Sequence, residues 1–117
     1  LSAGWGLIPA SFLTPSYDIT FLAKADPWRR RRHHAVVSDF SMLPIDTKGP
    51  IVFLGGKGYL PLFLRLTAHI SSPRIVLFNS STMPNAPDCR LVQFSTKRKT
   101  NWHYECASAL LRGQIEL

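Results

Sequence analysis

The sequence predicts a small α/β fold, with a mainly parallel sheet and helices on its faces. Two short apolar runs, Ile51–Leu54 and Arg74–Phe78, have the composition of strands that are buried on both faces. Between them, residues 59–70 carry apolar side chains almost all round a helix, with Pro61 near the first turn, where proline is tolerated. A strand, a helix and a strand in this order form a unit whose strands pair in parallel.

The segments before and after this unit carry weaker strand signals. Residues 17–22 combine β-branched and aromatic side chains, and residues 35–37 and 90–94 are short apolar runs. Each is expected to be a strand.

A second helix is expected near the C-terminus. Trp102, Cys106 and Leu110 fall on one apolar stripe at helical spacing. Thr100 or Asn101 is expected to cap its start with a side chain, and Gly113 suits the position that follows its last turn.

Length and composition indicate one domain of residues 17–117, preceded by an apolar extended arm of residues 1–16. Because 45% of the 117 residues are hydrophobic and only 18% are charged, the composition argues against disorder along the whole chain. Nine prolines and seven glycines, without a heptad pattern, exclude a coiled coil. The most apolar stretch, residues 51–66, contains three glycines and two basic residues, which excludes a membrane span. The density of glycine and proline in the arm argues against a regular element there.

Charge is the first indication of function. Fourteen lysines and arginines stand against seven acidic residues, a formal net charge of +7. Such an excess favours polyanionic partners, and nucleic acid is the commonest of these. The strongest cluster is four consecutive arginines, at positions 29–32, followed by His33 and His34. Arginine binds phosphate oxygens with two hydrogen bonds, and the adjacent Trp28 has a ring that stacks on unpaired bases. A nuclear localisation signal, an anionic-lipid patch and a solvated loop are the alternatives.

Lysines after two predicted strands form a second basic region. Lys57 lies in the turn Gly55-Gly56-Lys57-Gly58, where glycine permits close backbone approach or positive φ, and where helix amides can hold an anion. The alternative is a tight turn with one exposed lysine. Ligands bind at the carboxyl ends of parallel strands, and the run at 97–99 lies at the mouth of such a connection; if Lys57 shares that edge, a basic rim forms there. The predicted nucleic-acid contacts are therefore Trp28, Arg29, Arg30, Arg31, Arg32, Lys57, Lys97, Arg98 and Lys99.

Residues 51–78 resemble the C-terminal strand–helix–strand segment of PIN/NYN-type nuclease domains. That family often has the turn Gly-Asp-Gly-Asp-aromatic-x-Pro-Leu, and here Tyr59, Pro61 and Leu62 match its second half, while Gly56 and Gly58 replace the two acids. The resemblance implies an inactive member, because that family uses clustered carboxylates to hold a divalent metal ion. Asp39 is the candidate for a first-strand acid, and Asp18 and Asp46 are looser candidates.

The preferred function is a non-catalytic, basic RNA-binding subunit of a ribonucleoprotein assembly, of the mitochondrial ribosome or RNA-processing type. Residues 1–16 are expected to contact a neighbouring protein subunit, and no catalytic residue, metal or cofactor is expected. The alternatives are a metal-dependent PIN/NYN-like endoribonuclease and an accessory subunit of a membrane-associated complex. Because the chain begins at Leu1, we expect a processed or partial chain; a mitochondrial location is preferred, with nuclear or cytoplasmic as the alternative. Whether Cys89 and Cys106 form a disulfide is left open.

Overall fold

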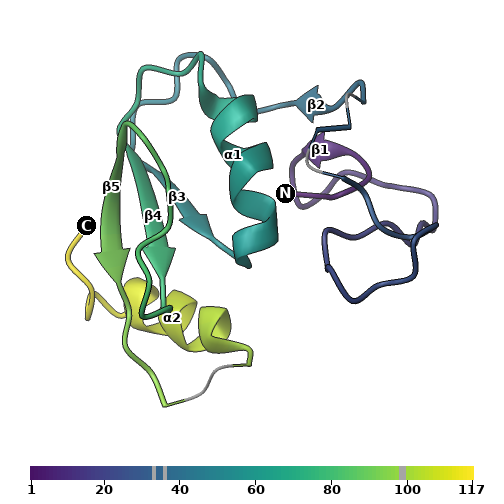
Figure 1. The fold of residues 1–117 in the computed structure, drawn as a ribbon. Helices are drawn as coiled ribbons and strands as arrows, with labels where there is room; N and C mark the ends of the chain where they lie inside the picture. The colour runs from purple at the N-terminus through teal and green to yellow at the C-terminus, as the bar shows by residue number, and fades with distance from the viewer. Residues whose placement is uncertain (33, 36, 98–99) are drawn as a thin grey trace. The chain divides into compact units, whose positions relative to one another are not determined.

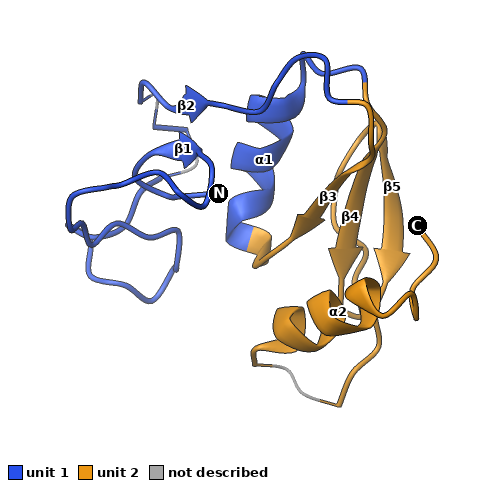
Figure 2. Cartoon of the chain, turned by 180° about the vertical axis from the view of Figure 1, so that it is seen from behind, with its two compact units in different colours: residues 1–47, 58–71 blue, residues 48–57, 72–117 orange. Residues whose placement is uncertain are grey.

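The computed structural model describes residues 1–32, 34–35, 37–97 and 100–117. It confirms an α/β fold with parallel strand pairing, and Figure 1 shows the order of the elements along the chain. The chain divides into two compact units, coloured separately in Figure 2. Unit 1 comprises residues 1–47 and 58–71, and unit 2 comprises residues 48–57 and 72–117. Each unit is described by itself.

Unit 2 contains a three-stranded parallel sheet. Its strands are β3 (Ile51–Leu54), β4 (Arg74–Phe78) and β5 (Cys89–Gln93), with β4 in the centre. The register places Val52 opposite Ile75 and Ile75 opposite Arg90. Ile75, Val76 and Leu77 are all 4% exposed or less, so β4 is buried on both faces as its apolar composition predicts. Burial of a side chain such as Leu77 contributes about 2 kcal/mol.

Helix α2 (Trp102–Leu111) packs its apolar stripe against one face of this sheet. Trp102 and the fully buried Cys106 form a core with Leu77, and side chains of β3 and β5 complete it. Val52, Leu54, Leu77 and Val92 point to the same face because paired residues of parallel strands share a side. The stripe predicted for the second helix is therefore confirmed.

The end of α2 follows its sequence signal, whereas its start does not. Gly113 has φ of +66°; its N–H donates to Leu110 and that of Gln114 to Ala109, which is the Schellman motif. At the other end, Asn101 occupies the N-cap position, but its φ is +60° and its side chain makes no capping hydrogen bond. The predicted side-chain cap is wrong at Asn101, because this left-handed backbone differs from the extended backbone of a capping residue.

Unit 1 is held by short strands. Strand β1 (Gly6–Leu7) pairs in parallel with β2 (Phe40–Ser41), so the expectation of no regular element in residues 1–16 is wrong. Residues 17–22 form no strand, only a parallel bridge between Thr20 and Arg30. Residues 35 and 37 also lie outside any strand, and Val36 lies outside the described residues. A single bridge satisfies few backbone hydrogen-bonding groups. Side-chain contacts therefore hold the rest of this segment in place.

Aromatic rings fasten the first segment to β2. The ring of Trp5 stacks on Phe40 with an interplanar angle of 5° and 6.2 Å between centroids, and Phe12 contacts both rings. The hydroxyls of Ser2 and Tyr17 are hydrogen-bonded at 2.5 Å. Residues 1–16 thus pack on residues of their own unit, although Leu13 within them is 94% exposed.

Helix α1 (Leu60–Thr67) supplies the core of unit 1. It follows a 3₁₀ turn, η1 (Lys57–Tyr59), and has Pro61 in its first turn, as its sequence predicts. Leu62 and Leu66 form a buried cluster with Ala3 and Phe21. None of the glycines at 55, 56 and 58 has positive φ, so the turn is made by η1 without left-handed backbone.

Both cysteines are free thiols; Cys89 is partly exposed and Cys106 is buried. Burial raises the pKa of the Cys106 thiol, so it remains protonated at neutral pH. In the described ranges, neither helix is long and apolar enough to cross a membrane.

Among the glycines of unit 1, Gly6 is the position where a side chain is least tolerated. Its φ is +85°, and a Cβ atom there would lie 2.5 Å from the carbonyl oxygen of Phe40. We therefore expect Gly6→Ala to lower the free energy of unfolding by about 2 kcal/mol or more, because β1 must move away from β2. Urea denaturation measures this change. Gly56→Ala is the control, since a Cβ atom at Gly56 meets no atom within 4 Å, and an equal loss in both variants would contradict the prediction.

Candidate nucleic-acid interface

Within the run of four arginines, Arg30 forms a parallel bridge with Thr20, after a turn in which the N–H of Arg29 donates to the carbonyl of Asp26. The N–H of Thr20 donates to the carbonyl of Arg29 at 2.9 Å, and the N–H of Arg31 donates to the carbonyl of Thr20 at 2.8 Å. Successive side chains of an extended segment point to opposite sides. Arg30 and Arg32 are accordingly exposed, whereas the side chain of Arg31 is only 6% exposed. The run therefore does not present one continuous basic surface.

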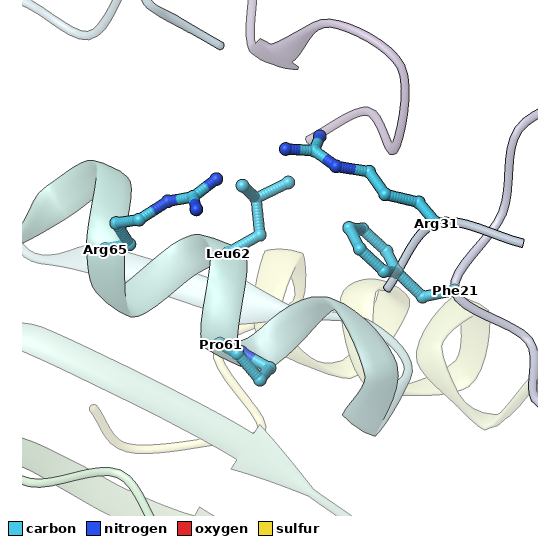
Figure 3. A pocket seen from close by; sticks show the side chains of 5 residues that line it. All are labelled: Phe21, Arg31, Pro61, Leu62 and Arg65. Carbon is cyan, nitrogen blue, oxygen red and sulfur yellow. The ribbon is translucent and has the colours of Figure 1, made fainter. Parts of the chain in front are cut away.

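Arg31 binds a buried carboxylate. Its two terminal nitrogens donate to the two carboxylate oxygens of Asp39, each at 2.7 Å, and one of them also donates to the carbonyl of Ala3 at 2.9 Å. Arg65 of α1 donates to the same carboxylate, whose side chain is 3% exposed. Figure 3 shows the guanidinium groups of Arg31 and Arg65 turned toward one another on either side of the Leu62 side chain. We call Arg31, Asp39 and Arg65 the buried triad after its buried Arg31–Asp39 pair; the side chain of Arg65 is 43% exposed.

The electrostatics of the buried triad keep Asp39 ionised. The hydrogen bonds from Arg31 hold the pKa of Asp39 below its usual value, and the charges of Arg31 and Arg65 act in the same direction, against the desolvation of the carboxylate. Because two guanidinium groups bind this carboxylate, its role is to hold segments of the fold together. Its lone pairs toward Arg31 and Arg65 are already occupied.

The acids that the nuclease alternative requires do not assemble in the described part of the chain. No three His, Cys, Asp or Glu side chains lie together there in a group able to hold a metal ion. Asp18 is 58% exposed and pairs with Arg29, and Asp46 is exposed in a loop. Asp39 has its structural role in the buried triad.

Trp28 and the other arginines of the run differ in exposure and in the intramolecular contacts that occupy their side chains. Arg29 pairs with Asp18 at 2.5 Å and lies over the ring of Trp28, 5.8 Å from its centroid. Arg30 donates from one nitrogen to the carbonyl of Ala23 at 2.9 Å. Arg32 is exposed, and Trp28 is 73% exposed. Trp28, Arg30 and Arg32 therefore retain the most surface toward solvent.

In unit 2 two lysines follow strands that run in the same direction. Lys57 comes three residues after β3, and Lys97 comes four residues after β5; both are exposed. Because the three strands are parallel, their carboxyl ends lie at one edge of the sheet, as the sequence predicts. We call this the carboxyl edge. Arg98 and Lys99, which the sequence also assigns to the interface, lie outside the described residues.

Two partners in unit 1 were not predicted from the sequence. Asp18 lies 11 positions before Arg29, and Arg65 lies 26 positions after Asp39. Neither separation belongs to a local pattern of a helix or strand. The alternation of an extended segment was the available signal, because it predicts that neighbouring arginines face opposite sides.

The buried triad makes a testable contribution to stability. Asp39→Asn leaves the buried guanidinium of Arg31 without a charged partner, and breaking a buried ion pair in this way costs about 3 kcal/mol or more. We expect the urea midpoint at pH 7 to fall accordingly, with tryptophan fluorescence and circular dichroism reporting the same transition. Asp18→Asn, which breaks an exposed pair, is the control, and a comparable loss there would contradict this assignment.

The same ion pairs predict how stability depends on pH. Because the pKa of Asp39 is lowered in the folded state, its contribution is complete above the unfolded value of about 3.9 and disappears as the pH falls toward the folded value. The stability difference between the wild type and Asp39→Asn should therefore shrink below about pH 4. A difference that stays constant from pH 7 to pH 3 would contradict this origin.

Comparisons with known proteins identify no homologue of this chain. Neither the protein-family models nor the curated proteins nor the solved structures include a significant match to this chain. The resemblance of residues 51–78 to PIN/NYN-type nuclease domains rests on their motif alone.

Proposed function

We propose that this chain is a non-catalytic, basic RNA-binding subunit of a ribonucleoprotein assembly. The distribution of charge between the two units carries the proposal. Unit 2 contains eight basic and three acidic residues, whereas unit 1 contains six basic and four acidic residues. Most of the net charge of +7 therefore belongs to unit 2, and excess charge of this sign attracts a phosphate backbone.

The carboxyl edge is the proposed phosphate-binding surface of unit 2. Lys57 and Lys97 are exposed there, and Arg98 and Lys99 follow Lys97 in the sequence. Ligands of open parallel sheets bind outside the carboxyl ends of the strands, where the loops leave backbone and side-chain groups uncovered. Lysine at such a position binds phosphate as a point charge, with no base specificity.

Unit 1 contributes fewer phosphate contacts than its sequence suggests. Arg31 belongs to the buried triad, and Arg29 shares its charge with Asp18. Arg30 and Arg32, both exposed, are the arginines of the run that we assign to phosphate. A contact between residues 1–16 and a neighbouring protein subunit is part of the proposal, and Leu13 within them is 94% exposed. The composition fits an assembly of the mitochondrial ribosome or RNA-processing type, and a mitochondrial location is proposed with it.

A salt titration of RNA binding tests this proposal. The full chain is mixed with a fluorescent single-stranded RNA, and anisotropy is measured from about 50 to about 200 mM salt. The plot of log K against log salt has a negative slope, and each lost phosphate contact makes that slope shallower by about 0.7 for a single strand. We expect Lys57→Ala/Lys97→Ala to make the slope shallower by about 1.4.

The control removes the same charge from the opposite edge of the same sheet. Lys48 precedes β3 and Arg90 lies near the start of β5, and both are exposed. Lys48→Ala/Arg90→Ala should leave the slope close to that of the wild type. Equal slopes in the two double variants would contradict the carboxyl edge, and no binding at 50 mM salt would contradict RNA binding itself. Cleavage of the RNA in Mg²⁺, stopped by EDTA, would favour the endoribonuclease.

A further inference from the structure

Unit 1 contains a cavity of about 300 Å³ beside the arginine run. Its apolar wall includes Ala3, Ile19 and Val37, and Gly4, Trp28, Arg30 and Arg31 also line it. The volume lies at the lower end of small-molecule pockets, so the cavity suits one compact group. An aromatic ring and guanidinium groups beside an apolar wall favour a flat ligand that carries or adjoins negative charge.

The indole of Trp28 is oriented by its neighbours although it is largely exposed. The guanidinium of Arg29 lies over the ring, 5.8 Å from its centroid, and Asp18 holds that guanidinium at 2.5 Å. The carbonyl of Asp26 accepts the backbone N–H groups of Arg29 and Arg30, which fixes the turn that carries Trp28. Trp28 remains 73% exposed, so its ring is accessible to a ligand.

The charged part of the lining has one fixed and one adaptable member. Arg31 is immobilised by Asp39 and by the carbonyl of Ala3, so it forms a rigid wall. Arg30 is exposed and binds Ala23 through one nitrogen, which leaves the rest of its guanidinium to an incoming anion. A purely apolar occupant would desolvate Arg30 without an acceptor, and that is unfavourable.

We propose that this cavity binds one unpaired base of a single-stranded RNA. The base stacks on Trp28 against the apolar wall, and Arg30 contacts the adjoining phosphate. Stacking on an aromatic side chain tolerates any base, because every base has a π face. This inference rests on the proposed RNA binding and adds to it a contact that does not depend on phosphate.

A comparison of two RNAs separates the base contact from the phosphate contacts. One is a single-stranded 12-nucleotide oligouridylate, and the other is an abasic strand with the same number of phosphates. We expect the wild type to bind the base-bearing strand about fivefold to about 150-fold more tightly than the abasic strand. The ratio should change little between about 50 and about 200 mM salt, because both strands release the same counterions.

Variants at Trp28 assign this preference to the cavity. Trp28→Ala should bring the two affinities together, whereas Trp28→Phe should keep part of the preference because it retains a ring. Tyr104→Ala is the matched control: Tyr104 is 69% exposed, lies on α2 in unit 2, and should leave the ratio unchanged. Circular dichroism verifies that each variant is folded. We expect all of them to fold, because the side chains of Trp28 and Tyr104 are largely exposed.

The outcomes distinguish this inference from the proposal on which it rests. Equal affinity of the wild type for the two strands would overturn the base cavity and leave phosphate binding intact. A preference that persists in Trp28→Ala would also overturn it, because the bases would then bind elsewhere. Absence of binding to both strands would overturn RNA binding and the base cavity together, and a protein or lipid ligand would then account for Trp28.

Discussion

The carboxylate of Asp39 is the point where the separate segments of unit 1 meet. It binds Arg31 of the arginine run and Arg65 of α1, and Arg31 also reaches the carbonyl of Ala3 near the first residue. A carboxylate that is 3% exposed requires all of these donors, since an unpaired buried charge is costly. Strands of two residues supply few hydrogen bonds, so side-chain contacts such as these determine how the run, the first segment and α1 are held.

The accuracy of the sequence predictions follows the length and periodicity of each element. β3, α1 and β4 were predictable because their apolar runs are continuous, and Gly113 marked the end of α2. The strand predicted at residues 17–22 was wrong, since Phe21 there packs in a side-chain core and pairing is limited to one bridge at Thr20. Of the strand predicted at residues 35–37, Ala35 and Val37 lie outside any strand, and Val36 lies outside the described residues. β1 was missed because its pairing depends on Gly6 passing close to Phe40, which no local pattern encodes.

The candidate interface was predictable in composition and only partly in geometry. The carboxyl edge follows from strand direction, so the placement of Lys57 and Lys97 after the carboxyl ends of two parallel strands could be inferred before the sheet was known. The division of the arginine run could not, because the acids that bind it lie 8 and 11 positions away in sequence. Four identical residues thus have different environments, from the buried Arg31 to the exposed Arg32, and only the fold distinguishes them.

The interleaving of the two units along the chain constrains how the protein folds during synthesis. Unit 1 needs residues 58–71, which emerge only after β3, a strand of unit 2, has been made. Unit 2 needs β4, β5 and α2, which follow the last residue of unit 1. The first 47 residues therefore leave the ribosome without the helix that completes their core, and β3 emerges without a partner strand. Pairing between segments that are distant in sequence is slow, so the nascent chain exposes apolar surface for longer than a chain with local contacts. A chaperone or an early assembly partner can bind this surface during that time.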